Sequence, residues 1–276
     1  MTAATRILTV LGDPVEHSLS PLIQNAALAE AELDAIYVAF RCDGEDVPTL
    51  IRALARAGGA GNVTLPHKER AAAVVEEASE AVRRTGACNT FWSENGTLYG
   101  DNTDVQGFRE ALHVFRPTGV AGARVLLLGA GGAARAALVS LLDEGVGEVV
   151  ILNRTLERAR VMSRRIGGDR ARVAESVSDL EDREFELVVN ATRLGLRPED
   201  PLPVALEKLE AVGGVMDLVY GRKETPFVLH ARAAGIPAVD GREMLVRQGA
   251  ASFARWWNRS APLAAMRQVL DDGSEG

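Results

Sequence analysis

The stretch Arg124–Thr155, RVLLLGAGGAARAALVSLLDEGVGEVVILNRT, decides the fold of this 276-residue chain. It opens with the continuous apolar run Val125–Leu128, which breaks at the glycine-rich turn Gly129–Gly132. Apolar residues then recur at helical spacing, and a second β-branched run, Val149–Leu152, follows. This order predicts a strand, a glycine turn, a helix and a second strand. Because the first run does not alternate with polar residues, it is typical of a strand buried on both faces.

The glycine turn matches the pattern GxGxxG/A of dinucleotide-binding folds. In that pattern Gly129 makes the tight turn, Gly131 lets the backbone approach a pyrophosphate, and Ala134 lets the helix pack on the strand. The free N–H groups at the start of the helix favour an anion there. Any tight connection from strand to helix favours glycine, so an ordinary turn remains the alternative if this motif is taken alone.

The end of the second strand indicates which dinucleotide binds. A site for NAD carries an Asp or Glu about 20 residues further on, where it binds the ribose hydroxyl. Here the strand runs into Asn153–Arg154–Thr155, which has no acid and one cation. A guanidinium pairs with a 2′-phosphate and stacks on adenine, whereas a carboxylate repels the phosphate. The sequence therefore predicts NADP, with an ordinary exposed arginine as the alternative interpretation of Arg154.

Length and composition restrict the class of protein. The chain is long enough for two domains, and its mixture of apolar and charged residues is that of a globular protein. A net charge of −7 argues against non-specific binding of nucleic acid. Cys42 and Cys88 form no disulfide framework, and their spacing to the histidines indicates no metal site. Without a signal peptide or a long apolar span, we expect a cytoplasmic protein with no membrane segment. We further expect a monomer or a homodimer.

Lysine is rare enough in this chain to single out one position. Of 31 basic residues only three are lysines, and Lys68 follows a predicted strand in the segment NVTLPHK. An ammonium, unlike a guanidinium, can give up its proton in a suitable environment, as proton transfer requires. Lys68 is therefore a candidate catalytic residue, with chance placement as the alternative. We expect the adjacent His67 to be a partly exposed neighbour.

Two serines stand at the start of the first predicted helix, in the segment HSLSP. Ser20 before Pro21 is typical of a helix N-cap, whereas Ser18 has no such role. Two hydroxyls beside free N–H groups also suit a carboxylate ligand. Further along, GDNTD (residues 100–104) places more polar residues before a helix than capping requires.

Periodicity and turn signals predict an α/β protein of two domains. We expect strands at Arg6–Leu11, Ile36–Arg41 and Gly61–Leu65, helices at Pro21–Leu33, Asp46–Ala57, Glu69–Glu80 and Val105–Phe115, and a hairpin at Ala87–Tyr99 that turns at Ser93–Gly96. We expect further strands at Arg124–Gly129, Glu148–Leu152, Ala171–Ala174, Phe185–Asn190, Val215–Val219 and Ile236–Val239.

The predicted domains are 1–104 together with 241–276 for the substrate, in a mostly parallel sheet, and 105–240 for the dinucleotide, in a Rossmann-like fold. Arg116–Gly119 breaks a helix and is the linker candidate. The last 36 residues hold two helices and are too few to bury a core alone, so we expect them to return to the N-terminal domain. Asn190–Thr192 is interpreted as a polar strand end that faces the cofactor.

Eight segments in order along the chain resemble those of the shikimate dehydrogenase family: NVTLPHKE, GACNT, GDNTD, GAGGAAR, NRT, NAT, MDLVY and GREMLVRQGAASF. The resemblance implies Lys68 and Asp104 as the catalytic pair. It implies binding of a cyclohexene acid by Ser18, Ser20, Thr64, Lys68, Asn89, Asp104, Tyr220 and Gln248. It implies binding of NADP by Gly129, Ala130, Gly131, Gly132, Ala133, Asn153, Arg154, Thr155, Arg158, Leu218 and Gly241.

The resemblance also implies the reaction, an NADP-dependent reduction of 3-dehydroshikimate to shikimate in chorismate biosynthesis. Within the same architecture, quinate/shikimate dehydrogenases and aminoshikimate enzymes are the alternatives. Methylenetetrahydrofolate dehydrogenase also carries a lysine, but HSLSP and GDNTD argue against it. An NADP-binding sensor without catalytic activity is the alternative from another class, and the retention of Lys68 and Asp104 argues against it.

Overall fold

The computed structural model describes residues 2–181, 183–197, 199–221 and 223–272. The chain divides into unit 1, Met1–Gly107 with Leu245–Gly276, and unit 2, Phe108–Met244. Both boundaries fall inside helices, α5 (Thr103–Phe115) and α9 (Arg242–Trp257), which continue from one unit into the other.

The segment Arg116–Gly119, expected to be the linker, lies inside unit 2 instead. The Arg116 guanidinium donates hydrogen bonds to the carbonyl oxygens of Glu186 and Gly213, so this turn is fixed to its own unit. The linker prediction was therefore wrong, because the helix break that suggested it serves to turn the chain into the first strand of unit 2.

Unit 2 contains an all-parallel sheet of six strands in the order β14-β13-β11-β7-β8-β9. The order reverses between β7 and β11, and the glycine turn follows β7. Ligands bind at this position in doubly wound sheets. The strands are β7 (Arg124–Leu128), β8 (Glu148–Leu152), β9 (Ala171–Ala174), β11 (Leu187–Asn190), β13 (Val215–Asp217) and β14 (Ala238–Val239).

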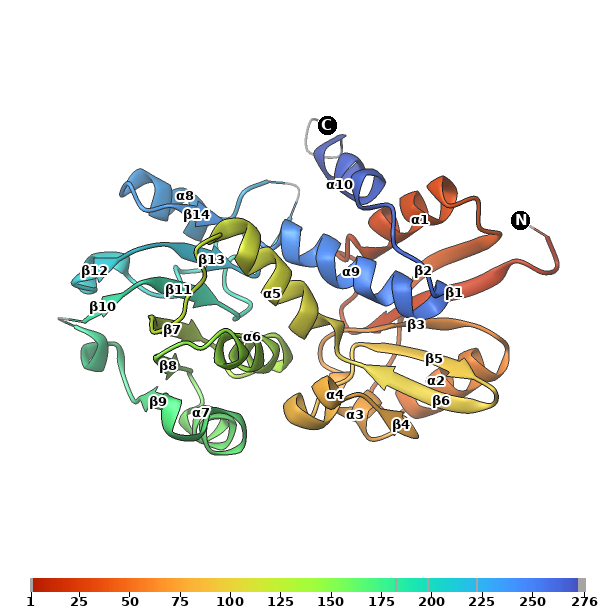
Figure 1. Ribbon diagram of the computed structural model, residues 1–276, viewed down its shortest axis with the longest axis horizontal. Coiled ribbons are helices and arrows are strands. Elements are labelled where there is room, and N and C mark those ends of the chain that lie inside the picture. The colour runs from red at the N-terminus through yellow and green to blue at the C-terminus, as the bar shows by residue number, and fades with distance from the viewer. Residues whose placement is uncertain (1, 182, 198, 222, 273–276) are drawn as a thin grey trace. The chain divides into compact units, whose positions relative to one another are not determined.

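Successive residues of β7 pack into two separate cores, which explains why the run is apolar throughout. Val125 and Leu127 join the core beneath α6 (Gly132–Asp143) and α7 (Leu156–Met162). Leu126 joins the core on the other face, with α8 (Pro226–Ala233). Figure 1 shows α6 and α7 on one side of this sheet and α8 on the other. The prediction of a Rossmann-like parallel sheet is confirmed.

Shorter elements complete unit 2. They are a two-stranded parallel pair, β10 (Glu184–Phe185) with β12 (Ala211–Val212), a π-helical turn at Ser163–Gly167, and 3-10 turns at Gly168–Arg170, Val177–Leu180 and Leu206–Lys208.

Unit 1 contains a six-stranded sheet in the order β2-β1-β3-β5-β6-β4. The strand β1 pairs in parallel with β2 and β3, whereas β5 runs antiparallel to β3 and β6. The strands are β1 (Arg6–Gly12), β2 (Ala35–Arg41), β3 (Ala60–Val63), β4 (Glu77–Ala78), β5 (Thr90–Glu94) and β6 (Thr97–Asp101). One core lies under α2 (Val47–Arg56), α3 (Lys68–Ala72) and α4 (Glu80–Thr85).

The predicted hairpin is confirmed, whereas the predicted helix Glu69–Glu80 was wrong. Asn95 and Gly96 have φ values of 51° and 84°, as the tight turn between β5 and β6 requires. In place of the helix the chain forms α3, β4 and α4. Glu77 and Ala78 pair in parallel with β6. Ser79 then starts α4 by accepting a hydrogen bond from the N–H of Val82 at 3.2 Å.

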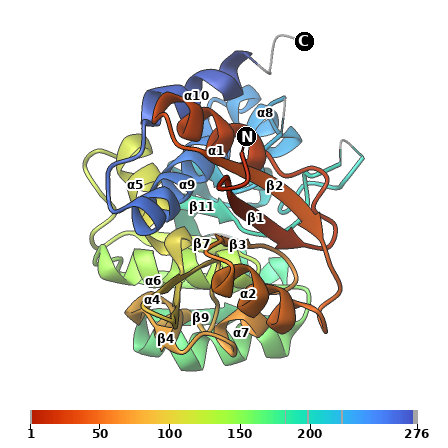
Figure 2. The same ribbon diagram turned by 90° about the vertical axis from the view of Figure 1, so that its right-hand side faces the viewer.

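The C-terminal helices belong to unit 1, as predicted. Figures 1 and 2 show α10 (Leu263–Asp272) beside α1 (Ser20–Glu30), and the two helices are in contact. The side chain of Gln24 in α1 donates to the carbonyl of Gly249 in α9 at 2.9 Å. Among the described residues, no helix is long and apolar enough to cross a bilayer, and no group of three or more acidic, His or Cys side chains is placed to hold a metal ion.

Candidate active site

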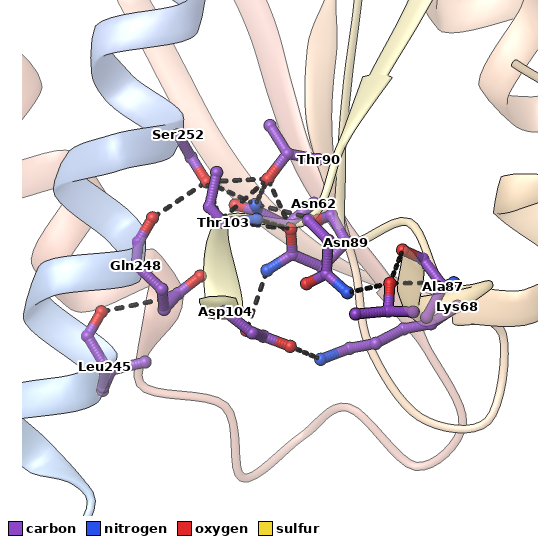
Figure 3. Close-up of polar contacts among 12 residues, drawn as sticks. Asn62, Lys68, Ala87, Asn89, Thr90, Thr103, Asp104, Leu245, Gln248 and Ser252 are labelled. Atoms are coloured by element: carbon purple, nitrogen blue, oxygen red, sulfur yellow. Dashed lines mark hydrogen bonds and ion pairs between the residues drawn. The ribbon is translucent and has the colours of Figure 1, made fainter. Parts of the chain in front are cut away.

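An ion pair between Lys68 and Asp104 forms the centre of the candidate site in unit 1 (Figure 3). Lys68 is the first residue of α3, immediately after the turn that follows β3, and Asp104 lies in the first turn of α5. Lys68 Nζ donates to Asp104 Oδ2 at 2.5 Å, and the two side chains are only 14% and 8% exposed. A pair so far removed from water has a strong mutual attraction and leaves little freedom to either group.

Asn89 provides the second hydrogen bond to the Asp104 carboxylate. Its Nδ2 donates to Asp104 Oδ1 at 2.8 Å, and its Oδ1 accepts from the backbone N–H of Thr103 at 2.8 Å. The N–H of Cys88 donates to the carbonyl of Lys68 at 2.9 Å, which fixes the GACNT segment against the start of α3. Each oxygen of Asp104 therefore has a donor and keeps a lone pair for a ligand hydroxyl.

Ser20 is not the N-cap of the first helix that the sequence predicted, and Ser18 contacts the start of the helix instead. Ser20 is already inside α1, whose N-cap residue is Leu19, and no side chain caps the helix. The hydroxyl of Ser18 accepts from the N–H of Ser20 at 3.3 Å instead. The interpretation of Ser20 as an N-cap was wrong, because Ser18 is the serine that meets the helix start. Ser20 is 8% exposed and Ser18 is more open.

The remaining predicted substrate ligands lie in both units. In unit 1, Thr64 packs its methyl group where a Cβ on Gly12 would lie, 2.4 Å away. Gln248 Nε2 donates to the carbonyl of Leu245 at 2.9 Å, one turn earlier in α9. Tyr220 belongs to unit 2 and follows β13.

His67 is not the partly exposed neighbour that was expected. The ring is 3% exposed, and Nε2 is 2.9 Å from the carbonyl oxygen of Cys42. The imidazole therefore holds the chain after β2 against the turn that carries Lys68. Asp101 of the GDNTD segment also has a structural role, because its carboxylate accepts from Ser79 Oγ at 2.5 Å and from Arg255 Nε at 2.9 Å.

The glycine turn of unit 2 has the form that a pyrophosphate needs. Gly129 has a φ of +111°, and a Cβ there would lie 2.9 Å from the carbonyl oxygen of Ala191. A Cβ on Gly131 would meet nothing within 4 Å, and no side chain caps α6, which begins at Gly132. Ala134 is completely buried under the sheet. The first N–H groups of α6 thus have no side-chain cap, and the approach at Gly131 is open to an anion.

The segment after β8 offers the cation expected for NADP. Arg154, Thr155 and Arg158 are exposed, and Asn153 Nδ2 donates to the carbonyl of Thr155 at 2.8 Å, which shapes the turn. The residues at both ends of the predicted site therefore fit the phosphates of this dinucleotide. Ala130 and Ala133 lie within the glycine turn and the first turn of α6.

The MDLVY and NAT segments meet in a buried hydrogen-bond network. Asn190 is completely buried, whereas Ala191 and Thr192, which follow it at the strand end, are half-buried. Its Nδ2 donates to the carbonyl of Leu194 at 3.0 Å and to Asp217 Oδ1 at 2.8 Å. Asp217 also accepts from the N–H of Val219 and the hydroxyl of Thr225. Burial raises the pKa of Asp217 to about 6, although these three hydrogen bonds oppose the shift.

Close backbone packing positions Leu218 beside Gly241. A Cβ on Gly241 would lie 2.4 Å from the carbonyl oxygen of Leu218, and the Gly241 N–H donates to the carbonyl of Val219 at 3.0 Å. Only glycine allows this approach.

Sequence reasoning missed three polar residues that surround Asn89: Asn62, Thr90 and Ser252. They lie on β3, β5 and α9 and are almost completely buried. All three lie in segments that resemble the family, NVTLPHKE, GACNT and GREMLVRQGAASF, but none of them belongs to a recognisable catalytic spacing. Beyond those segments, the signal for them is a polar residue at a position expected to be buried.

Comparison with known proteins agrees with this arrangement. Residues 10–91 match the family model described as shikimate dehydrogenase substrate binding domain, residues 110–194 match shikimate / quinate 5-dehydrogenase, and residues 241–270 match shikimate 5'-dehydrogenase C-terminal domain. The shikimate dehydrogenase (NADP(+)) of Maricaulis maris is 38% identical over 98% of this chain and 96% of its own length.

Solved structures agree over the same length. The shikimate dehydrogenase of Aquifex aeolicus has a TM-score of 0.90 at 33% identity, over 99% of this chain and all of its own. The shikimate 5-dehydrogenase of Thermus thermophilus, solved with NADP(H) and shikimate, has a TM-score of 0.86 at 35% identity, over 97% of this chain and 99% of its own. The similarity extends over both units and the returning helices. The chain therefore belongs to the shikimate dehydrogenase family.

Proposed function

We propose that this chain catalyses the reversible NADPH-dependent reduction of 3-dehydroshikimate to shikimate. The observation that carries the proposal is the buried Lys68–Asp104 pair, held by Asn89, in a chain whose other unit has the glycine turn and the exposed Arg154 of an NADP site. The family to which the chain belongs supports the same reaction, which serves chorismate and aromatic amino-acid biosynthesis.

The chemistry of Lys68 follows from its position. When bound, the dinucleotide supplies a hydride to the carbonyl carbon, and negative charge develops on the carbonyl oxygen. The Lys68 ammonium stabilises that charge and donates the proton that completes the alcohol. In the oxidative direction the neutral amine accepts the same proton. Asp104 positions the ammonium through Oδ2 and accepts a hydrogen bond from a ring hydroxyl of the substrate.

Besides Lys68 and Asp104, six side chains are assigned to substrate binding. Ser18 and Ser20 orient the substrate carboxylate, and Thr64, Asn89, Tyr220 and Gln248 contact the remaining groups. These interactions hold the substrate in one orientation, which lowers the entropic cost of reaching the transition state.

Cofactor binding is assigned to unit 2. The start of α6 with Gly129, Ala130, Gly131, Gly132 and Ala133 holds the pyrophosphate. The adenosine 2′-phosphate is held by Asn153, Arg154, Thr155 and Arg158, while Leu218 and Gly241 hold the remainder of the dinucleotide.

Changing Arg154 and Thr155 to Leu and Val should raise the KM for NADP far more than that for NAD, because only NADP carries the phosphate. Equal effects on both KM values contradict the assignment.

A quinate/shikimate dehydrogenase is the second candidate, because the family model over residues 110–194 includes both substrates in its description. Quinate has a tetrahedral carbon at the carboxylate, so its carboxylate leaves the ring at another angle. Ser18 and Ser20 flank one residue and should suit one angle better, although a pocket rejects an added hydroxyl by only about 100-fold.

The decisive experiment measures kcat/KM for shikimate and quinate with NADP and NAD, from absorbance at the nicotinamide band. Shikimate with NADP should give the highest value. A quinate value equal to or above that of shikimate assigns the chain to the second candidate. Absence of turnover with every combination of substrate and cofactor supports an NADP-binding sensor without catalytic activity and overturns the proposal. We further propose that the protein is cytoplasmic, and the two buried free cysteines agree with a reducing compartment. We also propose that it is a monomer or a homodimer, two states that light scattering distinguishes by their mass.

A further inference from the structure

The orientation of the Asn89 amide is fixed by a donor that has no alternative role. The backbone N–H of Thr103 points at one end of the amide at 2.8 Å, and a backbone N–H can only donate. That end is therefore the oxygen Oδ1, and the other end is the NH₂ group that faces Asp104 Oδ1 at 2.8 Å. If the amide rotated by half a turn, the N–H of Thr103 and the Asp104 carboxylate would each face the wrong partner.

Two hydroxyls donate to the same oxygen, and a third contacts both of them. The hydroxyl cluster consists of Thr90 on β5, Thr103 on α5 and Ser252 on α9, all at most 2% exposed (Figure 3). Thr90 Oγ1 is 2.9 Å from Asn89 Oδ1 and 2.8 Å from Ser252 Oγ. Thr103 Oγ1 is 3.1 Å from Asn89 Oδ1 and 3.0 Å from Ser252 Oγ.

Asn62 sets the direction in which these hydroxyls donate. The Tyr37 hydroxyl donates to Asn62 Oδ1 at 2.7 Å, so the NH₂ group of Asn62 faces the hydroxyl cluster. It donates to Thr90 Oγ1 and Ser252 Oγ, both at 2.9 Å. A hydroxyl that accepts in this way uses its own hydrogen to donate to another partner. Thr90 Oγ1 donates to Asn89 Oδ1, and Ser252 Oγ donates to the carbonyl of Gln248 at 3.1 Å.

We propose that Thr90, Thr103 and Ser252 are positioning residues for the reaction. The hydrogen bonds run in one direction, from Tyr37 through Asn62 and Thr90 to Asn89, and end on the Asp104 carboxylate. They hold the Asn89 NH₂ group on Asp104 Oδ1, which keeps Oδ2 directed at Lys68. This inference rests on the proposed function, because it concerns the alignment of the proposed proton donor.

The test compares two substitutions at Thr90, the hydroxyl that contacts every other member of the cluster. Thr90→Val keeps the shape of the side chain and removes the hydroxyl, whereas Thr90→Ser keeps the hydroxyl and removes the methyl group. Thr9→Val is the matched control, because Thr9 is buried on β1 of the same unit and its hydroxyl has no hydrogen-bond partner among the described residues.

We expect Thr90→Val to lower kcat about tenfold, because the net free energy of one hydrogen bond corresponds to a rate factor of about this size. The KM for NADP should stay unchanged. The solvent deuterium isotope effect on kcat should rise, because a misaligned Lys68 makes proton transfer slower relative to the other steps. Thr90→Ser should retain most of the wild-type kcat, and Thr9→Val should match wild type in kcat and isotope effect.

Two results overturn the inference. Either Thr90→Val retains the wild-type kcat, or Thr90→Ser loses as much kcat as Thr90→Val with no change in isotope effect, which indicates packing alone. If Thr90→Val does not fold, Thr103→Val and Thr103→Ser replace the pair at Thr90 with the same expectations, because Thr103 Oγ1 also donates to Asn89 Oδ1, at 3.1 Å. Wild-type protein without turnover overturns the proposed function, a result that is distinct from both.

Discussion

Lys68 is the proposed proton donor, and its ammonium is held in place by a hydrogen bond to Asp104 Oδ2 at 2.5 Å. Lys68→Ala should lower kcat by about 10² to 10⁴, the usual contribution of a positioned general acid. The KM for NADP should stay nearly unchanged, because the residues proposed to bind the cofactor lie in unit 2. Lys208→Ala, at an exposed lysine of unit 2, is the control and should keep the wild-type rate. A loss of less than about tenfold excludes Lys68 as the proton donor.

Asp217 shows how one buried carboxyl makes stability depend on pH. Burial raises its pKa from 3.8 to about 6 in the folded chain. Between these values the folded state keeps a proton that the unfolded state has lost, so stability falls as pH rises. Above about pH 6 the full cost of ionisation, about 3 kcal/mol, is present.

Asp217→Asn removes this ionisation while keeping the shape of the side chain. Relative to wild type, the free energy of unfolding of the variant should therefore improve between pH 4 and pH 7, by up to about 3 kcal/mol. Urea unfolding followed by circular dichroism at both pH values measures the difference, and the contributions of other groups cancel in the comparison. A difference that is the same at both pH values contradicts the prediction.

At the scale of elements, the sequence predicted best where one local pattern also determines the tertiary contacts. The stretch Arg124–Thr155 forms β7, α6 and β8 as expected, because the apolar run is buried on both faces and the glycine turn is used at a close backbone contact. The hairpin of β5 and β6 was predicted for the same reason. Its turn residues adopt the φ values that the connection requires.

The sequence predicted less where distant contacts outweigh local preference. The alanine-rich segment Glu69–Glu80 has good helix formers, but Glu77 and Ala78 gain a strand partner in β6, and Ser79 starts a new helix. The hydroxyl cluster was missed for a related reason. Thr90, Thr103 and Ser252 are up to 162 positions apart, and only the packing of α9 against unit 1 brings them together.

Gly107 of the helix α5 packs closely against the helix α9 in unit 1. A Cβ at this position would lie 2.6 Å from Gln248 Cβ and 2.7 Å from its backbone nitrogen. Gly107→Ala should therefore push α9 away and destabilise the protein by about 1–3 kcal/mol, although alanine favours the helix. Both Gly107→Ala and Gln248→Ala should raise the KM for shikimate, but only the first should lower Tm. A Tm at or above wild type for Gly107→Ala contradicts this packing.

At the scale of the whole molecule, the chain returns to its first unit to complete it. The returning helix α10 buries Met266 and Leu270, and α9 buries Phe253 and Trp256. All three tryptophans, Trp92, Trp256 and Trp257, belong to unit 1. Tryptophan fluorescence therefore follows the unfolding of this unit separately from unit 2.

Met266 tests whether α10 contributes to the stability of unit 1 or only covers it. Its side chain is completely buried. Met266→Ala should therefore lower the free energy of unfolding by about 2–5 kcal/mol, through lost burial and the cavity left behind. Urea unfolding followed by tryptophan fluorescence measures this change. Leu22→Ala in α1 is the control, because Leu22 is 42% exposed and should cost less than about 1 kcal/mol. If Met266→Ala unfolds at the wild-type urea concentration, α10 is dispensable for unit 1, and the C-terminal return serves only to bring α9 with Gln248 and Ser252 to the site.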